Sequence, residues 1–261
     1  MKFASTFLVV VLFVSATAMG RDDALPKAED VLDRFVEVTG GAEAYAKIHS
    51  RRERMELYLS YESEAAIVTT ETARPKDARG RVEFADGRVT EWGFHDGIGW
   101  SVSPEGVSVE SGEQLKWSEY DAQVGWETNR RALYESMTVE SRALFDGVEC
   151  FKLRITTKSG LEQTHYLEIK TGLRRGLAMT QKMPYGTREV SRVFTDYRPV
   201  DGVMLAHKMV GTNRILESGA EWTTTIKSLS IEHNVGFQSD HFEPPAEVKA
   251  RLKKSASATG D

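Results

Sequence analysis

The feature that most constrains this chain is a set of Asp-Gly pairs, each placed between runs of alternating apolar and polar residues. An Asp-Gly pair tolerates the left-handed backbone of a two-residue hairpin turn, so each pair predicts a tight connection between antiparallel strands. The pairs are Asp86-Gly87, Asp96-Gly97, Asp146-Gly147 and Asp201-Gly202. The chain is therefore expected to fold mainly as one large antiparallel sheet.

The alternation that marks strands begins near residue 51, where Met55, Leu57 and Leu59 occupy every second position. Further strands are expected near residues 64–73, 79–85, 88–95, 98–103, 106–110, 138–145, 148–157, 162–169, 173–183, 187–198, 203–211 and 221–232. About a dozen strands in succession, each rotated by ~20° from the last, favour a sheet that closes or half-closes around a core.

Helical patterns are confined to the N-terminal part and to one break in the alternation. Residues 26–38 carry Val31, Leu32, Phe35 and Val38 on one stripe, and Gly40-Gly41 ends this helix before a short piece at 42–48. Residues 112–136 are interpreted as a helical excursion between two halves of the sheet. These helices are expected to cap the concave side.

The N-terminus has the pattern of a cleavable secretory signal peptide, residues 1–18. Lys2 precedes an apolar run at 7–14 and the site Ala16-Thr17-Ala18. That run is about half of the ~20 residues that cross a bilayer, which disfavours the alternative of a membrane anchor. The single cysteine, Cys150, is far from this site, so we expect export to the periplasm without lipidation and without a disulfide.

No linker divides the chain before residue 244, so a single domain is expected over residues 24–246. Residues 247–261 are basic, with Lys249, Arg251, Lys253 and Lys254, and are interpreted as a disordered tail; contact with an anionic membrane surface is the alternative. The net charge of −5 becomes −6 once Lys2 is removed, which argues against a nucleic-acid partner.

Patterns that carry catalysis or bind metals do not occur in their usual spacing. Residues 99–103 approach the G-x-S-x-G pattern of serine hydrolases but lack its second glycine. H-E-x-x-H, C-x-x-C, P-loop and G-x-G-x-x-G patterns are missing. His233, Asp240 and His241 are close in sequence, yet their spacing matches no standard metal site. We therefore expect no catalytic residue, no cofactor and no metal.

Large apolar side chains on the expected strands are the best candidates for a binding site. A well-packed core would explain any one of them, but together on a curved sheet they would also enclose a space, where hydrocarbon gains ~0.8 kcal/mol per buried methylene. The candidates for an apolar cavity are Trp92, Phe94, Trp100, Phe151, Leu153, Ile155, Phe194, Leu205 and Trp222.

Over residues 26–246 the chain resembles the exported LolA-like, outer-membrane lipoprotein-sorting proteins. The resemblance is carried by Val31-Leu32-Asp33-Arg34-Phe35, Gly40-Gly41-Ala42, Asp96-Gly97-Ile98-Gly99-Trp100, the run from Tyr166 to Leu173, the run from Asp196 to Val203, His233-Asn234-Val235 and Phe242-Glu243-Pro244-Pro245. It implies an α+β, mostly antiparallel fold: an incomplete, half-open β-barrel of about eleven strands covered by helices. It also implies a periplasmic apolar cavity that holds acyl chains of lipoproteins or related lipids.

Three functions are compatible with these observations. The first is a monomeric, non-catalytic carrier for lipoprotein acyl chains or another amphiphile, with an inner- or outer-membrane protein as a further candidate partner. The second is an envelope sensor of the same fold that signals to a membrane partner. The third is an enzyme, which substitution of His165 or His207 would inactivate.

Overall fold

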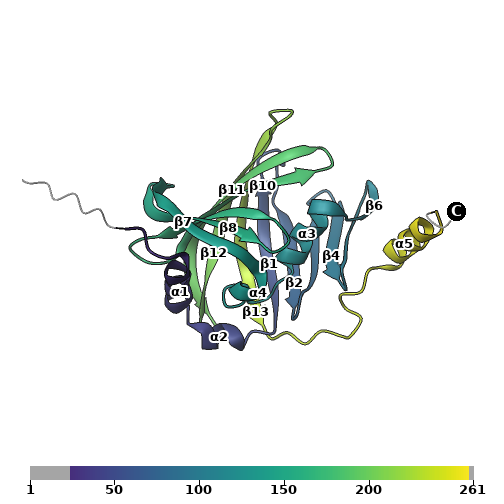
Figure 1. Ribbon diagram of the computed structural model, residues 1–261. Helices are drawn as coiled ribbons and strands as arrows, with labels where there is room; N and C mark the ends of the chain where they lie inside the picture. Colours follow the sequence, from purple (N-terminus) through teal and green to yellow (C-terminus); the bar gives the residue numbers. More distant parts are fainter. Residues whose placement is uncertain (1–23, 259–261) are drawn as a thin grey trace, which may run out of the picture.

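The computed structural model describes residues 24–258, so the expected signal peptide at 1–18 lies outside the described residues. Within them, all strands join one antiparallel sheet (Figure 1). The strands are β1 (Ser50–Leu59), β2 (Ala66–Ala73), β3 (Asp77–Glu83), β4 (Val89–His95), β5 (Ile98–Ser103), β6 (Gly106–Val109), β7 (Tyr134–Phe145), β8 (Val148–Thr157), β9 (Glu162–Glu168), β10 (Arg174–Met183), β11 (Gly186–Val200), β12 (Val203–Ile215) and β13 (Glu221–His233). The helices are α1 (Ala28–Val38), α2 (Ala42–Ala46), α3 (Gly112–Asp121), α4 (Arg130–Leu133) and α5 (Ala246–Ala258).

The Asp-Gly pairs occupy the hairpin turns predicted for them. At Asp96-Gly97, Asp146-Gly147 and Asp201-Gly202 both residues have positive φ, as a two-residue mirror-image turn requires. At Asp86-Gly87 only the glycine does (φ 86°), and Phe84 instead closes a longer turn by donating its N–H to the carbonyl of Arg88 at 2.9 Å. Local turn chemistry therefore sets the antiparallel order of the neighbouring strands.

The order across the sheet is β6-β5-β4-β3-β2-β1-β13-β12-β11-β10-β9-β8-β7. It has thirteen strands rather than about eleven. The chain leaves the sheet at the edge strand β6 and rejoins it at the opposite edge strand, β7. Helices α3 and α4 lie in this excursion, as predicted, and α3 contacts both β10 and the β4–β5 hairpin. Residues 134–136, expected to be helical, already belong to β7.

The corner between α1 and α2 is fixed against the turn that joins β11 and β12. Gly41 donates its N–H to the carbonyl of Val36 at 2.8 Å, which ends α1, and Gly40 has φ 125°. A Cβ at Gly40 would lie 2.2 Å from the carbonyl oxygen of Gly202, so only glycine permits this approach. Met204 also donates its N–H to the carbonyl of Thr39 at 2.9 Å.

The main core lies between α1, α2 and strands β7–β9 and β12. Leu32 of α1, Leu153 and Ile155 of β8, and Val203 of β12 are almost completely buried in it. Their burial offsets the entropy of ordering the N-terminal helices, which are too short to be stable alone. Figure 1 shows α1 and α2 at the end of the sheet where β7 lies, away from β6.

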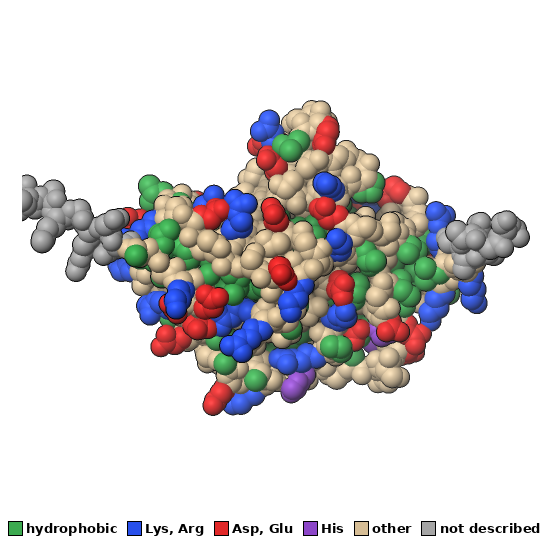
Figure 2. All heavy atoms as spheres, viewed as in Figure 1, with side chains coloured by type: hydrophobic (Ala, Val, Ile, Leu, Met, Phe, Trp, Pro, Cys, Tyr) green, Lys and Arg blue, Asp and Glu red, His purple; other side chains and the backbone are tan. Residues whose placement is uncertain are grey.

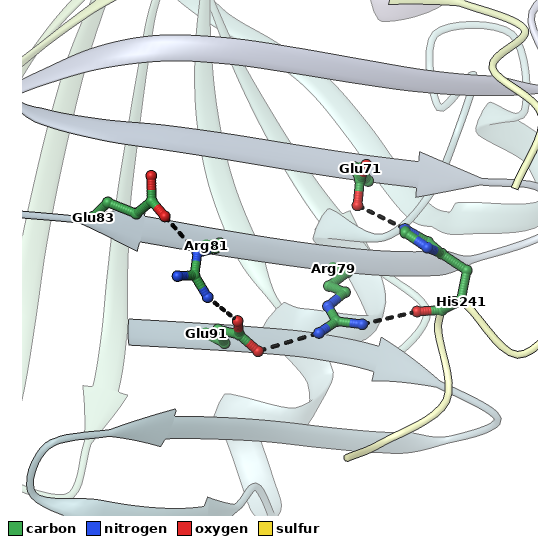
Figure 3. A network of polar contacts seen from close by, with 6 residues as sticks. All are labelled: Glu71, Arg79, Arg81, Glu83, Glu91 and His241. Atoms are coloured by element: carbon green, nitrogen blue, oxygen red, sulfur yellow. Dashed lines mark hydrogen bonds and ion pairs between the residues drawn. The ribbon is translucent and has the colours of Figure 1, made fainter. Parts of the chain in front are cut away.

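The outward face of β2–β4 carries a ladder of charged side chains that the C-terminal segment crosses (Figure 3). Glu91 accepts hydrogen bonds from both Arg79 and Arg81. His241 of the C-terminal segment contacts Glu71 at 2.6 Å, and its carbonyl accepts a hydrogen bond from Arg79 at 3.2 Å. The ladder therefore holds the C-terminal segment on the outside of the sheet.

The expectation of a disordered tail at 247–261 is wrong for its described part, which forms α5. Glu247 lies in the first turn, the following sequence is rich in strong helix formers, and Val248 is fully buried. Helix α5 contacts β6 and so covers part of that sheet edge (Figure 1). Composition suggested disorder, but one buried apolar anchor and good helix propensity favour a docked helix.

Figure 2 shows acidic and basic side chains interspersed over the visible face, with no extended area of one sign. Among the described residues, no helix has the length and apolar character needed to span a membrane.

Candidate functional site

A small cavity of about 150 Å³ lies between the sheet and the segments that cover its concave side. We call it the interior site. Strands β1, β10, β11, β12 and β13 form its floor, and α1, α2 and the connection between α3 and α4 cover it. Its lining consists of Phe35, Tyr45, Arg51, Glu53, Trp126, Glu127, Arg174, Phe194, Tyr197, Met204, Leu205, Ala206 and Ile231.

A β-bulge directs Arg174 into the interior site. The register between β9 and β10 shifts between Arg174 and Gly176, so Arg174 is opposite Leu167 of the core, whereas Gly176, two residues on, is opposite Tyr166 on the other face. Arg175 lies outside, where it pairs with Asp146 at 2.5 Å and with Glu168 at 3.8 Å. The guanidinium of Arg174 instead lies 4.3 Å from the ring centre of Phe194 and 5.0 Å from that of Trp126. Arg174 is thus a cation held among aromatic rings.

Trp126 fills the space above Arg174. It comes from the irregular connection between α3 and α4, directly after Gly125 with φ 79°. Its ring stacks on Phe35 at 6.1 Å and meets His165 edge-on at 5.7 Å. The indole therefore closes the interior site from a short irregular segment rather than from a helix or strand.

Glu127 places a carboxylate in the same site. Its side chain is 8% exposed, and burial raises its pKa, opposed by the positive charges of Arg51 and Arg174. Neither arginine forms a close ion pair with it. The Nε atoms of Arg51 and Arg174 are buried without a hydrogen-bond partner in the described part of the chain. The site therefore contains a buried carboxylate and two partly exposed arginines that do not pair with it directly.

A second group of polar side chains lies behind Trp126. His165 is 1% exposed, and burial together with the charge of Arg174 lowers its pKa well below 6.5, so it is neutral. Its Nε2 lies 3.2 Å from Oε1 of Gln163, an atom that only accepts, so Nε2 carries the proton. Nδ1 of His165 and Nε2 of Gln163 are left without partners among the described residues. Trp126 covers His165 of this polar group on the side of the interior site, whereas Gln163 also lines the larger groove described next.

A larger cavity, about 680 Å³, is a separate groove over β9–β13. We call it the outer groove. The strand register aligns Thr164, Ala178, Ser191 and Thr212 in one row across four strands. Exposed charged side chains also line the groove: Arg154, Glu162, Lys182, Glu189, Arg214 and Glu221. The lining also includes the apolar side chains of Trp117, Leu161, Met179 and Val190, so it is mixed, and it includes none of the nine predicted residues.

The nine residues predicted to line an apolar cavity fall into several places. Leu153 and Ile155 are fully buried in the main core, and Phe151 packs against it. Only Phe194 and Leu205 line the interior site. Leu205 contacts both the core and the cavity, so the packed core and the binding site form one continuous apolar region.

The remaining four lie elsewhere on the sheet. Trp92 and Phe94 share a face of β4, with the Trp92 ring packed over Gly80. Trp100 of β5 is in register with Gly93 and so faces the opposite side, the side of Arg79, which the C-terminal segment crosses. Trp222 is half-buried opposite Asn213 at the start of β13. None of these four lines the interior site.

Sequence patterns did not identify Arg174, Trp126 or Glu127. Arg174 faces inward because of a bulge, which has no sequence signature here. A tryptophan after a glycine inside the aperiodic segment 112–136 was the one available signal for Trp126. For His165 the sequence offered only the alternative of an enzyme, and it gave no indication that this side chain is buried beside Trp126.

Other reactive groups are arranged as structural residues. Cys150 is fully buried, and burial raises its pKa to about 11, so the thiol is not a nucleophile at neutral pH. His233 lies 3.2 Å from Asp201, whereas His241 contacts Glu71. In residues 24–258 no group of three or more His, Cys, Asp or Glu side chains has the arrangement of a metal site.

A half-closed antiparallel sheet, with helices over its concave side and a site beneath them, is the LolA-like fold, as the sequence resemblance predicted. A LolA superfamily protein from Nitrosomonas europaea aligns with 84% of this chain and 99% of its own, at 10% identity and TM-score 0.55. A putative outer membrane lipoprotein-sorting protein domain from Vibrio parahaemolyticus aligns over 87% and 99%, at 16% identity and TM-score 0.52.

A DUF1329 family protein from Desulfovibrio piger aligns with 85% of this chain and all of its own, at 18% identity and TM-score 0.55. These identities are low, so the structures support the fold and not a shared ligand. Neither a scan against protein-family models nor a search of curated proteins finds a match.

Proposed function

We propose that this protein is a periplasmic, non-catalytic binding protein that carries an amphiphile, with the hydrocarbon part of the ligand in the interior site. The observation that carries this proposal is the closure of an aromatic and aliphatic cavity by one irregular segment, in which Trp126 stacks on Phe35. Proteins of this architecture include lipoprotein-sorting proteins, which supports a carrier and names no ligand for this chain.

The cavity of about 150 Å³ is smaller than the roughly 300–1,000 Å³ that ligand sites usually occupy. In this proposal the indole of Trp126 therefore lies where the hydrocarbon of the ligand would bind, and the site is enlarged when the ligand enters. Moving the short connection that carries Trp126 would join the cavity to the space in front of His165 and Gln163. That movement would cost α1 the stacking of Trp126 on Phe35, whereas the pairing of β9 to β12 involves no residue of that connection.

A carrier is favoured over an enzyme by the state of the buried groups. His165 is neutral and its Nε2 contacts an amide rather than a carboxylate, so it lacks the partner that orients a catalytic base. The single cysteine is a buried thiol.

The test is ligand capture by the mature chain. Native mass spectrometry after detergent-free purification from an envelope extract should reveal a bound lipid, and a fluorescent fatty-acid analogue should bind with saturation. Clean unliganded spectra combined with no saturable uptake of any long-chain probe would refute the proposal.

A further inference from the structure

Two adjacent residues, Trp126 and Glu127, place an apolar ring and a carboxylate side by side inside the protein. The ring lies against Phe35 and His165, and the carboxylate is buried near Arg51 and Arg174. In shape and charge this pair has the two parts of an anionic amphiphile. Both come from the same irregular segment, so one movement of the segment removes both.

The groups that face this pair are an apolar wall, two cations and the carboxylate of Glu53, which accepts a hydrogen bond from Ser228. Arg174 reaches the site through a bulge and lies over two aromatic rings, and no carboxylate of the described residues comes within ion-pair distance of it. Its Nε and that of Arg51 have buried, unused hydrogen-bonding capacity. A guanidinium nitrogen that is buried without a hydrogen-bond partner is unfavourable, and an anion that accepts its hydrogen bond relieves this cost.

Glu127 is a poor permanent partner for these arginines. Burial raises its pKa, and it forms no direct ion pair with either arginine. A ligand carboxylate or phosphate that reaches the guanidinium directly would form stronger, charge-assisted hydrogen bonds than Glu127 does from a distance.

Provided that the proposed carrier function holds, we propose that the ligand is an anionic amphiphile, a long hydrocarbon chain ending in a carboxylate or a phosphate monoester. Its anionic end binds Arg174 and Arg51, and its chain takes the place of the Trp126 ring. The Trp126-Glu127 pair occupies the site in the absence of ligand and leaves it on binding. A ligand with a neutral head group would displace Glu127 and leave both arginines without an anion. The site should therefore prefer anionic over neutral amphiphiles of the same chain length.

The experiment compares probes that share one chain and differ in charge: palmitate, hexadecyl phosphate, hexadecanol and hexadecyltrimethylammonium. Each probe competes with a fluorescent fatty-acid analogue for binding to the mature protein. Every probe is used below its own critical micelle concentration. We expect palmitate and hexadecyl phosphate to bind about tenfold or more tighter than hexadecanol, the size of one or two charge-assisted hydrogen bonds. The cationic probe should bind weakest. The ratio between palmitate and hexadecyl phosphate identifies the preferred anion.

Variants assign this selectivity to named residues. Arg174→Gln should reduce the preference for palmitate over hexadecanol to about one, because the chain still binds and the anion loses its partner. Arg175→Gln is the matched control, since it changes the adjacent arginine on the outer face and should leave the preference unchanged. Glu127→Gln should tighten palmitate binding several-fold and hexadecanol binding less, whereas Glu162→Gln in the outer groove should change neither.

The outcomes separate the two levels of the proposal. Equal, saturable binding of palmitate and hexadecanol, unaffected by Arg174→Gln, would overturn the anionic ligand and leave the carrier function standing. No binding of any uncharged or charged long-chain probe would overturn the carrier function itself. If Arg174→Gln does not fold, Glu127→Gln decides, because unchanged palmitate affinity in that variant contradicts displacement of Glu127.

Discussion

Trp126 lies edge-on to His165, with ring centres 5.7 Å apart and ring planes at 78°. The indole belongs to an irregular segment, whereas His165 belongs to β9 in the middle of a regular ladder. One partner is therefore fixed by the sheet and the other only by side-chain packing. Because Trp126 is held less firmly than His165, we expect the site to open by separation of these two rings.

Removal of the Trp126 side chain should separate stability from binding. We expect Trp126→Ala to lower the free energy of unfolding by about 2–3 kcal/mol, less than for a fully buried tryptophan, because the ring is half-buried. The same change should tighten the binding of a fluorescent fatty-acid analogue, since the ligand no longer has to displace the indole. Denaturant unfolding and fluorescence titration measure the two effects. Weaker ligand binding by a folded variant would mean that Trp126 is part of the binding surface rather than its occupant.

Two phenylalanines test where the site is. Phe194 lines the interior site and Phe94 does not, although Phe94 is the more deeply buried. We expect Phe194→Ala to weaken fatty-acid binding several-fold. Phe94→Ala should lower the free energy of unfolding by about 3–5 kcal/mol and leave the dissociation constant unchanged at temperatures where the protein is folded. The reverse pattern would place the site between β4 and α3.

His165 should make the protein less stable in mild acid. Its pKa in the folded state is lowered below 6.5 by burial and by Arg174, so the folded protein binds the proton less readily than the unfolded chain. The stability is therefore fully present above pH 6.5 and declines as the pH falls below it, by up to about 1.4 kcal/mol per pH unit for one proton.

Substitution His165→Gln should flatten this decline between pH 6.5 and 5, measured by denaturant unfolding at each pH. The exposed residue His49 provides the control, and His49→Gln should retain the slope of the wild type. A slope that His165→Gln leaves unchanged would assign the acid sensitivity to other groups.

Gly40 should tolerate a side chain far less well than Gly97, although both glycines have positive φ. A Cβ at Gly40 would collide with the carbonyl oxygen of Gly202, whereas at Gly97 it would meet open space. Gly97→Ala should cost about 1 kcal/mol from backbone strain alone. Gly40→Ala should cost about 2–4 kcal/mol, because the overpacking is added to the strain. Thermal unfolding of the two variants measures this difference, and equal costs would show that the corner between α1 and α2 yields readily.

The sequence by itself determined the hairpins and the helices that cap the sheet. The signals at Asp96-Gly97, Asp146-Gly147 and Asp201-Gly202 are local, because the turn conformation depends on the two residues that adopt it. The apolar stripe of α1 is likewise read from residues one turn apart. These local rules were sufficient for an antiparallel sheet with a helical excursion at 112–136.

Only the tertiary structure decided which side chains meet inside that sheet. Trp92 and Trp100 look equivalent in sequence, yet the register places them on opposite faces. Arg174 and Gly176 are two residues apart and would share a face of a regular strand, yet a bulge in the pairing of β9 with β10 places them on opposite faces and turns Arg174 inward. Strand pairing and the closure of a loop over it depend on contacts between distant segments. The interior site is therefore a property of the assembled sheet, which no short stretch of the sequence encodes.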